Sequence, residues 1–533
     1  MRGPIDERYD AIIIGAGVGG LTCASLLAAA GRRVLVLEQH YVAGGNATLF
    51  RRGRWAFDVG LHYIGDAHPG GTIDRILRAC GVEELELRPM CPELERVRYP
   101  DFEFSIPHSR EAYRARLHAQ FPADRDRRGV DRYMGFLEQC DRVALADQSG
   151  DPLRRALAIA RAPRLLRNLN STAGEVLDRC TDNPRLRAVF TAQHGTYAIS
   201  PRRVSAILHA GLQNHYFRSG GWYPAGGGQA LSDALADELE ARGGVIRLRA
   251  LVERVHVERG RVTGVTLRHV HHGVRRVDAP LVICNADVRR AATTLFDPAQ
   301  LPSGMTRALT RLAGYEMALP LFVVFLGLSI PPAELPYPNS NLWLNDRYDI
   351  DADYRALQRG ELPSPPSIYI STASLKDPHN AAIAPPGHSN LEIMTVVPSA
   401  PAFWGLEPAH DGVDPEYRKR ARYLEIKQQL TEACVDQAAR LIPGLKQRIV
   451  YREAATPLSH SRYTRSTAGS AYGFAATPAQ FLHNRPGPRT PVAGLMLCGT
   501  NCRAGHGIVG GMVSGLQAAD AALGGGLQRR VLA

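Results

Sequence analysis

The chain has 533 residues, 45% of them hydrophobic and 22% charged, which is the composition of a folded protein of two or three domains. Its formal net charge of +12 comes almost entirely from arginine without any block of like charge, so we expect no nucleic-acid partner. No apolar run reaches the roughly 20 residues of a spanning helix, and the charged first ten residues do not resemble a signal peptide. We therefore expect a cytoplasmic protein, soluble or associated peripherally with a membrane.

The first predicted elements form a βαβ unit. Residues 11–14 are a short β-branched run typical of a buried parallel strand, and a glycine-rich turn over 15–20 follows at once. An alanine- and leucine-rich helix is expected over 21–30, and a second strand over 34–37 ends at Glu38. This order of strand, glycines, helix, strand and acid predicts a dinucleotide site.

Each position of the turn fits a pyrophosphate. We expect Gly15 to permit the tight turn, Gly17 to let the backbone approach the phosphates and Gly20 to let helix and strand pack closely. The N-terminus of the helix then faces a dianion, which its free N–H groups and its dipole favour. Glu38 is placed to accept hydrogen bonds from the ribose hydroxyls.

Later glycines favour FAD over NAD. Gly44, Gly45 and the stretch 57–60 follow the βαβ unit, and an extended flavin nucleotide has to be met by more backbone along its length. Near the C-terminus, apolar residues 495–498 lead into a glycine loop over 499–510 and an alanine-rich helix. A second helix N-terminus can thus point at the same cofactor, and we expect FAD.

Hydrophobic patterns predict the remaining elements. Helices are expected over 111–120, 131–146, 153–169 with Pro163 inside it, 230–241 and 415–441. Strands are expected over 245–248, 321–326 and 391–397. The nine cysteines show neither a CxxC pair nor a metal-ligand spacing, so we expect free thiols and no metal site.

From end to end, the chain resembles the flavoprotein group of phytoene desaturases, carotenoid cis-trans isomerases and retinol saturases. The resemblance is carried by residues 38–45, 57–65, 223–231, 284–287, 377–378, 384–387, 456–457, 469–473 and the C-terminal glycine loop. His62 and Tyr63 are most like the isomerase and saturase branches. Thr500 stands where isomerases often carry an acid, and His506 where a small or amide-bearing residue is usual.

The resemblance implies an α/β fold of the amine-oxidase and glutathione-reductase superfamily. A Rossmann-like FAD-binding domain on a parallel sheet is expected over 1–70, 223–290 and 491–533, with an inserted α+β substrate domain over 71–222 and 291–490. FAD is expected to be bound non-covalently. The residues expected to contact it are Gly15, Gly17, Val18, Gly19, Gly20, Glu38, Gln39, Gly44, Gly45, Asn46, Gly60, Leu61, His62, Val252, Val255, Asn285, Gly499, Thr500, Gly505, Gly507, Ile508 and Val509.

The activity that this resemblance implies is desaturation, saturation or cis-trans isomerisation of a carotenoid-like or other polyene lipid. FAD then carries the redox step, and His62, Tyr63 and His506 are the catalytic candidates, for each of which a structural role is an equal alternative. Since only one complete dinucleotide fingerprint is present, a quinone or oxygen is the expected electron acceptor. Two alternatives remain: a flavin amine oxidase, although no lysine lies in the context such enzymes use, and a non-catalytic flavin-fold escort or binding protein.

One segment raises the question of a membrane partner. Between 153 and 169, five arginines alternate with leucine and isoleucine. Such a pattern is found in basic amphipathic helices that lie on anionic membranes, but a solvated arginine face over a protein core is the commoner case. The expected polyene substrate, which dissolves in lipid, keeps the membrane interpretation as the alternative.

Overall fold

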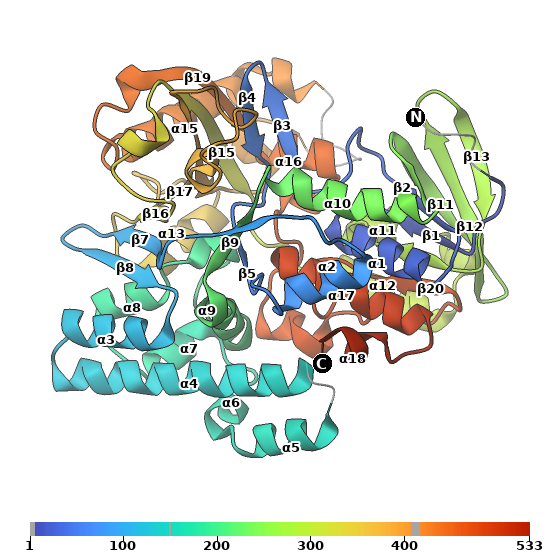
Figure 1. Cartoon of the computed structure of the whole chain (residues 1–533), viewed down its shortest axis with the longest axis horizontal. Helices are drawn as coiled ribbons and strands as arrows, with labels where there is room; N and C mark the ends of the chain where they lie inside the picture. Colours follow the sequence, from blue (N-terminus) through green and yellow to red (C-terminus); the bar gives the residue numbers. More distant parts are fainter. Residues whose placement is uncertain (1–5, 149–150, 408–415, 533) are drawn as a thin grey trace.

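A five-stranded parallel sheet forms the centre of one lobe of the computed structural model, which describes residues 6–148, 151–407 and 416–532 (Figure 1). The strand order is β10 (Val245–Arg247), β2 (Val34–Leu37), β1 (Ala11–Ile14), β14 (Val282–Cys284) and β20 (Leu495–Leu497). All four pairings are parallel. Both β1 and β2 are completely buried, as a sheet covered on both faces requires. Three segments far apart in the sequence therefore supply one sheet.

Different secondary-structure elements cover the two faces of this sheet. Ile13 packs with a helical layer, whereas its neighbours Ile12 and Ile14 pack on the other side, as the alternation of side chains along a strand dictates. The helical layer consists of α1 (Val18–Ala29), α2 (Thr72–Cys80), α10 (Gly228–Ala241), α17 (Gly507–Ala522) and α18 (Leu527–Leu532). The opposite layer consists of the antiparallel strands β11 (Ala250–Glu258), β12 (Arg261–His269) and β13 (Gly273–Asp278), with α11 (Val288–Thr294) and α12 (Ser303–Ala313).

The second lobe is built on a seven-stranded mixed sheet. Its order is β19 (Ile449–Ala455), β15 (Leu321–Leu328), β18 (Ser389–Val396), β17 (Ile368–Ser371), β16 (Asn341–Leu344), β7 (Glu93–Arg98) and β8 (Glu103–Pro107). Only the pair β16–β7 is parallel. The long helix α15 (Ala421–Ala439) buries its apolar side chains in one core with alternate residues of β15, such as Phe322 and Val324.

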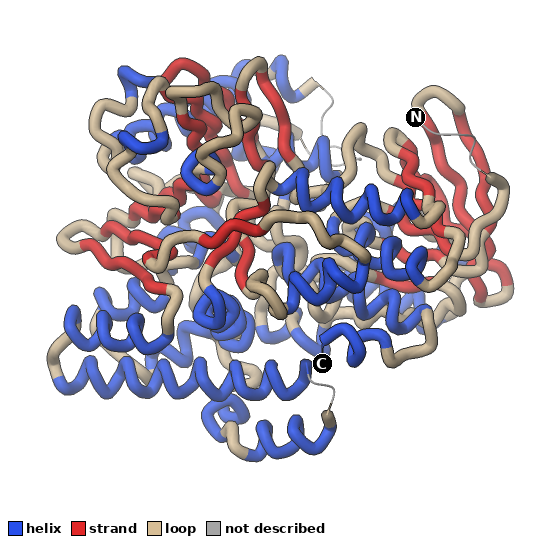
Figure 2. Tube along the Cα trace, viewed as in Figure 1, coloured by secondary structure: helices blue, strands red, loops and turns tan. Residues whose placement is uncertain are grey.

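A helical cluster covers the other core of this lobe, seen as the group of blue helices at the lower left of Figure 2. It contains α3 (Arg110–Gln120), α4 (Asp124–Gln148), α5 (Pro152–Ala160), α6 (Pro163–Arg167), α7 (Ala173–Asp178), α8 (Pro184–Phe190) and α9 (Ala206–Ser219). Two small sheets complete the strands, namely β3 (Leu49–Arg52) with β4 (Trp55–Asp58), and β5 (Ile64–Gly65) and β6 (Leu87–Pro89) on either side of β9 (Gly221–Pro224). The remaining α-helices are α13 (Ile350–Gln358), α14 (Ala373–Lys376) and α16 (Pro457–Thr464).

The sequence patterns located most elements and erred at some boundaries. The helix expected over 153–169 is two helices, because Pro163 lacks an N–H and begins α6 instead of continuing α5. The helix expected from residue 131 begins seven residues earlier, at Asp124. The helix expected over 415–441 is α15, and Pro415 lies outside the described residues. No helix in the described parts of the chain is both long and apolar enough to cross a membrane.

Candidate active site

The turn after β1 brings backbone segments together at distances that only glycine permits. Gly15 has a φ of +96°, and a Cβ on Gly20 would lie 2.2 Å from the carbonyl oxygen of Gly15. Gly17 forms a bridge with Gly44, and a Cβ on Gly45 would lie 3.2 Å from the Cα of Gly17. The turn therefore presents backbone, without side chains, to the space in front of α1.

Glu38 anchors this turn from the end of β2. Its Oε2 accepts a hydrogen bond from the Ala16 N–H at 2.8 Å, and its Oε1 accepts one from the His40 N–H at 2.7 Å. Burial raises the pKa of this carboxyl, against the lowering effect of these backbone N–H groups. A carboxylate has about four acceptor positions, so Glu38 keeps acceptor capacity for the hydroxyls of a ligand.

The second glycine loop lies against the first. Asn285 links them, since its Nδ2 donates to the Gly15 carbonyl at 3.1 Å while a Cβ on Gly499 would lie 2.6 Å from its Oδ1. Helices α1 and α17 also touch through glycines, because a Cβ on Gly515 would lie 2.3 Å from the carbonyl oxygen of Gly19. Both helices begin at the wall of one cavity.

This cavity has a volume of about 1190 Å³, larger than the roughly 300–1,000 Å³ of an ordinary ligand pocket. Almost all of the residues expected to contact FAD lie on its wall, together with the catalytic candidates His62, Tyr63 and His506. The exceptions are Gly20, Leu61 and Val255. Those three lie in the packed interior behind the wall, where Gly20 allows the close approach of α1 and the turn.

The far part of the cavity has a different wall. Its apolar and aromatic side chains come from α9 and from the seven-stranded sheet, and they include Leu208, Leu212, Tyr216, Trp343, Ile368, Tyr369 and Met394. Tyr63 stacks on Tyr216 with ring centroids 4.7 Å apart. No cysteine lies on the wall of the cavity among the described residues, and all nine are free thiols.

His62 is held by a carboxylate that the sequence analysis did not single out. Its Nδ1 lies 3.1 Å from Oε2 of Glu392, which is completely buried in β18 and also accepts a hydrogen bond from the Asp58 N–H at 2.8 Å. In the tautomer that donates from Nδ1 to this carboxylate, Nε2 is the ring nitrogen left for a ligand. The sequence feature that could have identified Glu392 is its position inside the apolar strand predicted over 391–397, because a buried carboxylate needs a polar partner.

A buried lysine lies beneath His62. The Nζ of Lys376 donates to the His62 carbonyl, to Asn341 Oδ1 and to Ser371 Oγ, each at 2.7 Å. Burial lowers the pKa of Lys376 to about 8, against the opposing pull of Glu392 and Asp58. Lys376 is not on the wall of the cavity, so its charge acts through the groups that it holds.

Asp58 shares this buried cluster. It accepts hydrogen bonds from the Tyr223 hydroxyl at 2.5 Å and from the Gly228 N–H at 2.9 Å. Burial and then the neighbouring charge of Glu392 raise the pKa of Asp58 to about 7. The structure thus brings together two carboxylates and a lysine immediately behind the cavity, next to His62 on its wall.

His506 has a different environment. Its Nε2 lies 3.0 Å from the Thr196 carbonyl oxygen, which can only accept, so Nε2 carries the proton. The ring stacks on Tyr472 with centroids 5.0 Å apart, and Nδ1 is buried without a partner within the described structure. Burial lowers the pKa of His506 to about 4, so the ring is neutral at pH 7.

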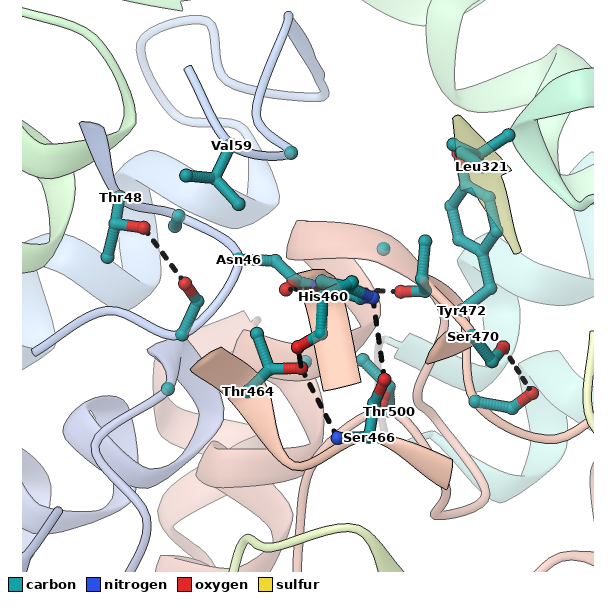
Figure 3. Close-up of a pocket in the computed structure, with 18 of the residues that line it drawn as sticks. Asn46, Thr48, Val59, Leu321, His460, Thr464, Ser466, Ser470, Tyr472 and Thr500 are labelled. Carbon is teal, nitrogen blue, oxygen red and sulfur yellow. Dashed lines mark hydrogen bonds between the residues drawn. The ribbon is translucent and has the colours of Figure 1, made fainter. Parts of the chain in front are cut away.

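Polar residues of the C-terminal half, including His460 and Thr464, also line the cavity (Figure 3). His460 Nε2 lies 2.8 Å from Asn46 Oδ1, and the Thr464 hydroxyl donates to the His460 carbonyl at 2.9 Å. His460 was not predicted as a site residue. No group of three or more histidine, cysteine or acidic residues suited to a metal ion occurs in the described ranges.

Comparison with known proteins places this geometry in a family. The family model of flavin containing amine oxidoreductases matches residues 18–523. The chain is 28% identical over 526 residues to the all-trans-retinol 13,14-reductase of Danio rerio, covering 93% of this chain and 83% of that protein. It is 25% identical over 532 residues to the chloroplastic prolycopene isomerase of Arabidopsis thaliana, covering 96% and 82%. The predicted resemblance to the saturase and isomerase group is confirmed.

Solved structures confirm the fold. A putrescine oxidase with bound putrescine is similar with a TM-score of 0.62 at 16% identity, covering 97% of this chain and 99% of that one. An oxidoreductase from Methanosarcina mazei is similar with a TM-score of 0.64 at 19% identity, covering 95% and 98%. The α/β fold with a Rossmann-like parallel sheet and an additional mixed sheet is thus as predicted.

Proposed function

This chain belongs to the flavin-containing amine oxidoreductases, and on that premise we propose that it is an FAD-dependent oxidoreductase acting on carbon–carbon bonds of an apolar polyene. The observation that carries the proposal is that one continuous cavity has two kinds of wall. Glycine backbone lines one end, and aromatic and aliphatic side chains line the other. Relatives named for retinol and prolycopene support this substrate class.

The glycine-lined end fits FAD. Gly17 and Gly45 present bare backbone to this end of the cavity, and the acceptor capacity of Glu38 suits the adenosine ribose. Gly499 and Gly507 would meet the flavin half from the second loop. With no cysteine on the described wall, we propose that FAD is held non-covalently. When bound, FAD exchanges a hydride with a substrate carbon.

The other end fits an apolar chain. Burial of about ten carbons there offers roughly 8 kcal/mol of binding free energy without any polar contact, at about 0.8 kcal/mol per CH₂. Saturation or desaturation also moves one proton to or from the neighbouring carbon. His62 is the residue proposed to hold that proton, because Glu392 fixes its Nδ1 and leaves Nε2 on the cavity side.

The electron acceptor follows from the same fold. The chain contains one βαβ dinucleotide unit with its glycine turn, so we propose that a desaturation would pass its electrons to a quinone or to oxygen. An isomerisation would need no acceptor, because it leaves the substrate with the same number of electrons.

The test is anaerobic incubation of flavin-loaded protein with cis and trans polyenes and, separately, with putrescine. We expect a change in polyene saturation or geometry, read by chromatography, together with the flavin spectrum. One relative, 27% identical over 478 residues, is named an inactive all-trans-retinol 13,14-reductase. The first measurement is therefore whether this protein turns over any polyene at all. Oxidation of the amine with unchanged polyenes would overturn the proposal in favour of an amine oxidase.

A matched pair of variants tests the role of His62. His62→Gln should slow polyene turnover by about 10²-fold or more, the usual contribution of a positioned acid or base. His271→Gln changes an exposed histidine in the turn between β12 and β13 and should leave turnover unchanged. If both variants turn over normally with flavin bound, His62 is structural only.

A further inference from the structure

Exposed leucines concentrate on one short part of the surface. Five leucines with more than two fifths of their area exposed lie between residues 145 and 169: Leu145, Leu153, Leu157, Leu166 and Leu169. In all other described parts of the chain, Leu424 is the one leucine with comparable exposure. Such a cluster differs from the scattered single apolar residues of an ordinary surface.

Helices α5 and α6 carry Leu153, Leu157 and Leu166, while Leu145 lies in α4 and Leu169 follows α6. Both helices pack on α4 and lie at the lower edge of the molecule in Figures 1 and 2. In α5, Ala158 is the fully buried residue, whereas Leu153 and Leu157 are one turn apart and 68% and 47% exposed. Residues four apart share a helix face, so this pair forms an apolar ridge that faces away from the protein.

The same surface carries a strong positive charge. Residues 151–169 contain five arginines and one acid, Asp151, which gives a net charge of +4. Arg154 pairs with Asp151 and Arg155 pairs with Asp147. No ion pair is found for Arg161, Arg164 or Arg167 in the described structure. Exposed leucines and arginines without an ion pair therefore alternate along the same short segment of the described chain.

We propose that α5 and α6, named here the α5–α6 surface, dock the protein on an anionic lipid bilayer. The leucines would enter the boundary between headgroups and acyl chains, and the arginines would contact lipid phosphates. A second copy of this chain does not suit the surface, because two faces of charge +4 repel each other. The inference does not depend on which substrate the cavity accepts.

The experiment is co-sedimentation of the flavin-loaded full chain with vesicles. Vesicles of phosphatidylglycerol mixed with phosphatidylcholine should bind the protein, and vesicles of phosphatidylcholine alone should bind it much more weakly. Arg161→Gln with Arg167→Gln should weaken binding about 30-fold, which corresponds to about 1 kcal/mol for each basic residue. Equal binding to both kinds of vesicle would overturn the proposal.

The leucines are tested against a matched pair elsewhere. Leu153→Ser with Leu157→Ser should weaken vesicle binding at least tenfold. The control is Val270→Ser with Val274→Ser in the β12–β13 hairpin, where the side chains are 69% and 52% exposed, and its binding should match the wild type. Unchanged melting temperature and flavin absorbance establish that both double variants are folded.

Two results would replace the bilayer with another explanation. If binding is lost in high salt but is insensitive to the leucine substitutions, the +12 chain adsorbs by charge alone, and the proposal is wrong. If vesicles do not bind but polyglutamate does, with loss of binding in the arginine variant, the surface takes an acidic polypeptide.

Discussion

The two ends of the cavity are built in different ways. At the dinucleotide end, the wall is backbone brought close by glycines, and the acid at the end of β2, Glu38, is held by two backbone N–H groups. At the aromatic end, the wall is side chains from separate elements, supported from behind by the buried charges of Asp58, Glu392 and Lys376. The first end depends on the absence of side chains, and the second depends on their pairing. Substitutions at the first end should therefore act by adding side-chain atoms, and those at the second end by removing a partner from a buried pair.

The largest effect is expected from Lys376→Met. This variant leaves the carboxylates of Glu392 and Asp58 buried without their cation, which typically costs about 3–5 kcal/mol of unfolding free energy. Urea denaturation measures the loss. Lys446→Met is the control, since Lys446 is 53% exposed in a surface ion pair with Asp436 and should lose less than about 1 kcal/mol.

A double substitution sharpens this prediction. Adding Glu392→Gln to Lys376→Met removes one of the uncompensated charges, so part of the lost stability should return. Simple additivity of the two single effects would mean that the lysine and the glutamate do not interact.

The second effect concerns pH. The pKa of Asp58 is raised from 3.8 to about 7 in the folded protein, so the folded state holds this proton more tightly than the unfolded chain does. The free energy of unfolding should consequently fall as pH rises from about 4 to 7, by up to about 4 kcal/mol from this group. Asp58→Asn should flatten that dependence, whereas Asp237→Asn, an exposed position on α10, should not.

The third effect tests the dinucleotide end. Gly20→Ala should cost about 3 kcal/mol or more and lower the flavin content, because the new Cβ would overlap the Gly15 carbonyl oxygen. Gly211→Ala is the matched control within a helix, since a Cβ there meets no atom within 4 Å, and it should stabilise the protein by up to about 1 kcal/mol. A tolerated Gly20→Ala with full flavin content would contradict the role of close backbone packing.

The smallest effects come from two buried tyrosine hydroxyls, that of Tyr223 behind the cavity and that of Tyr369 on its wall. Tyr223→Phe removes the hydrogen bond to Asp58 and should cost about 2 kcal/mol. Tyr369→Phe removes a buried hydroxyl on the cavity wall that has no partner in the described structure, so stability should change by less than about 1 kcal/mol. A large loss for Tyr369→Phe would show that its hydroxyl is bonded.

These differences also explain what the sequence could predict. Gly15, Gly17 and Glu38 were identifiable because close backbone approach and helix-terminal charge impose residue types at fixed spacing. The pairing of Glu392 with His62 was not identifiable, since it joins residues 330 positions apart through the register of a mixed sheet. The break of the helix at Pro163 is predictable from the missing N–H of proline, although the hydrophobic pattern alone suggested one continuous helix.

Completion of the parallel sheet has a consequence for synthesis of the protein. Strand β20, which forms the edge of the sheet, and helix α17, which follows the second glycine loop, are translated long after β14, the strand with which β20 pairs. The four strands β10, β2, β1 and β14 must therefore persist during translation without the edge strand and without part of their helical cover. The second glycine loop completes the cavity wall only at this step, so a chain truncated before β20 should retain less of the proposed flavin than the full chain.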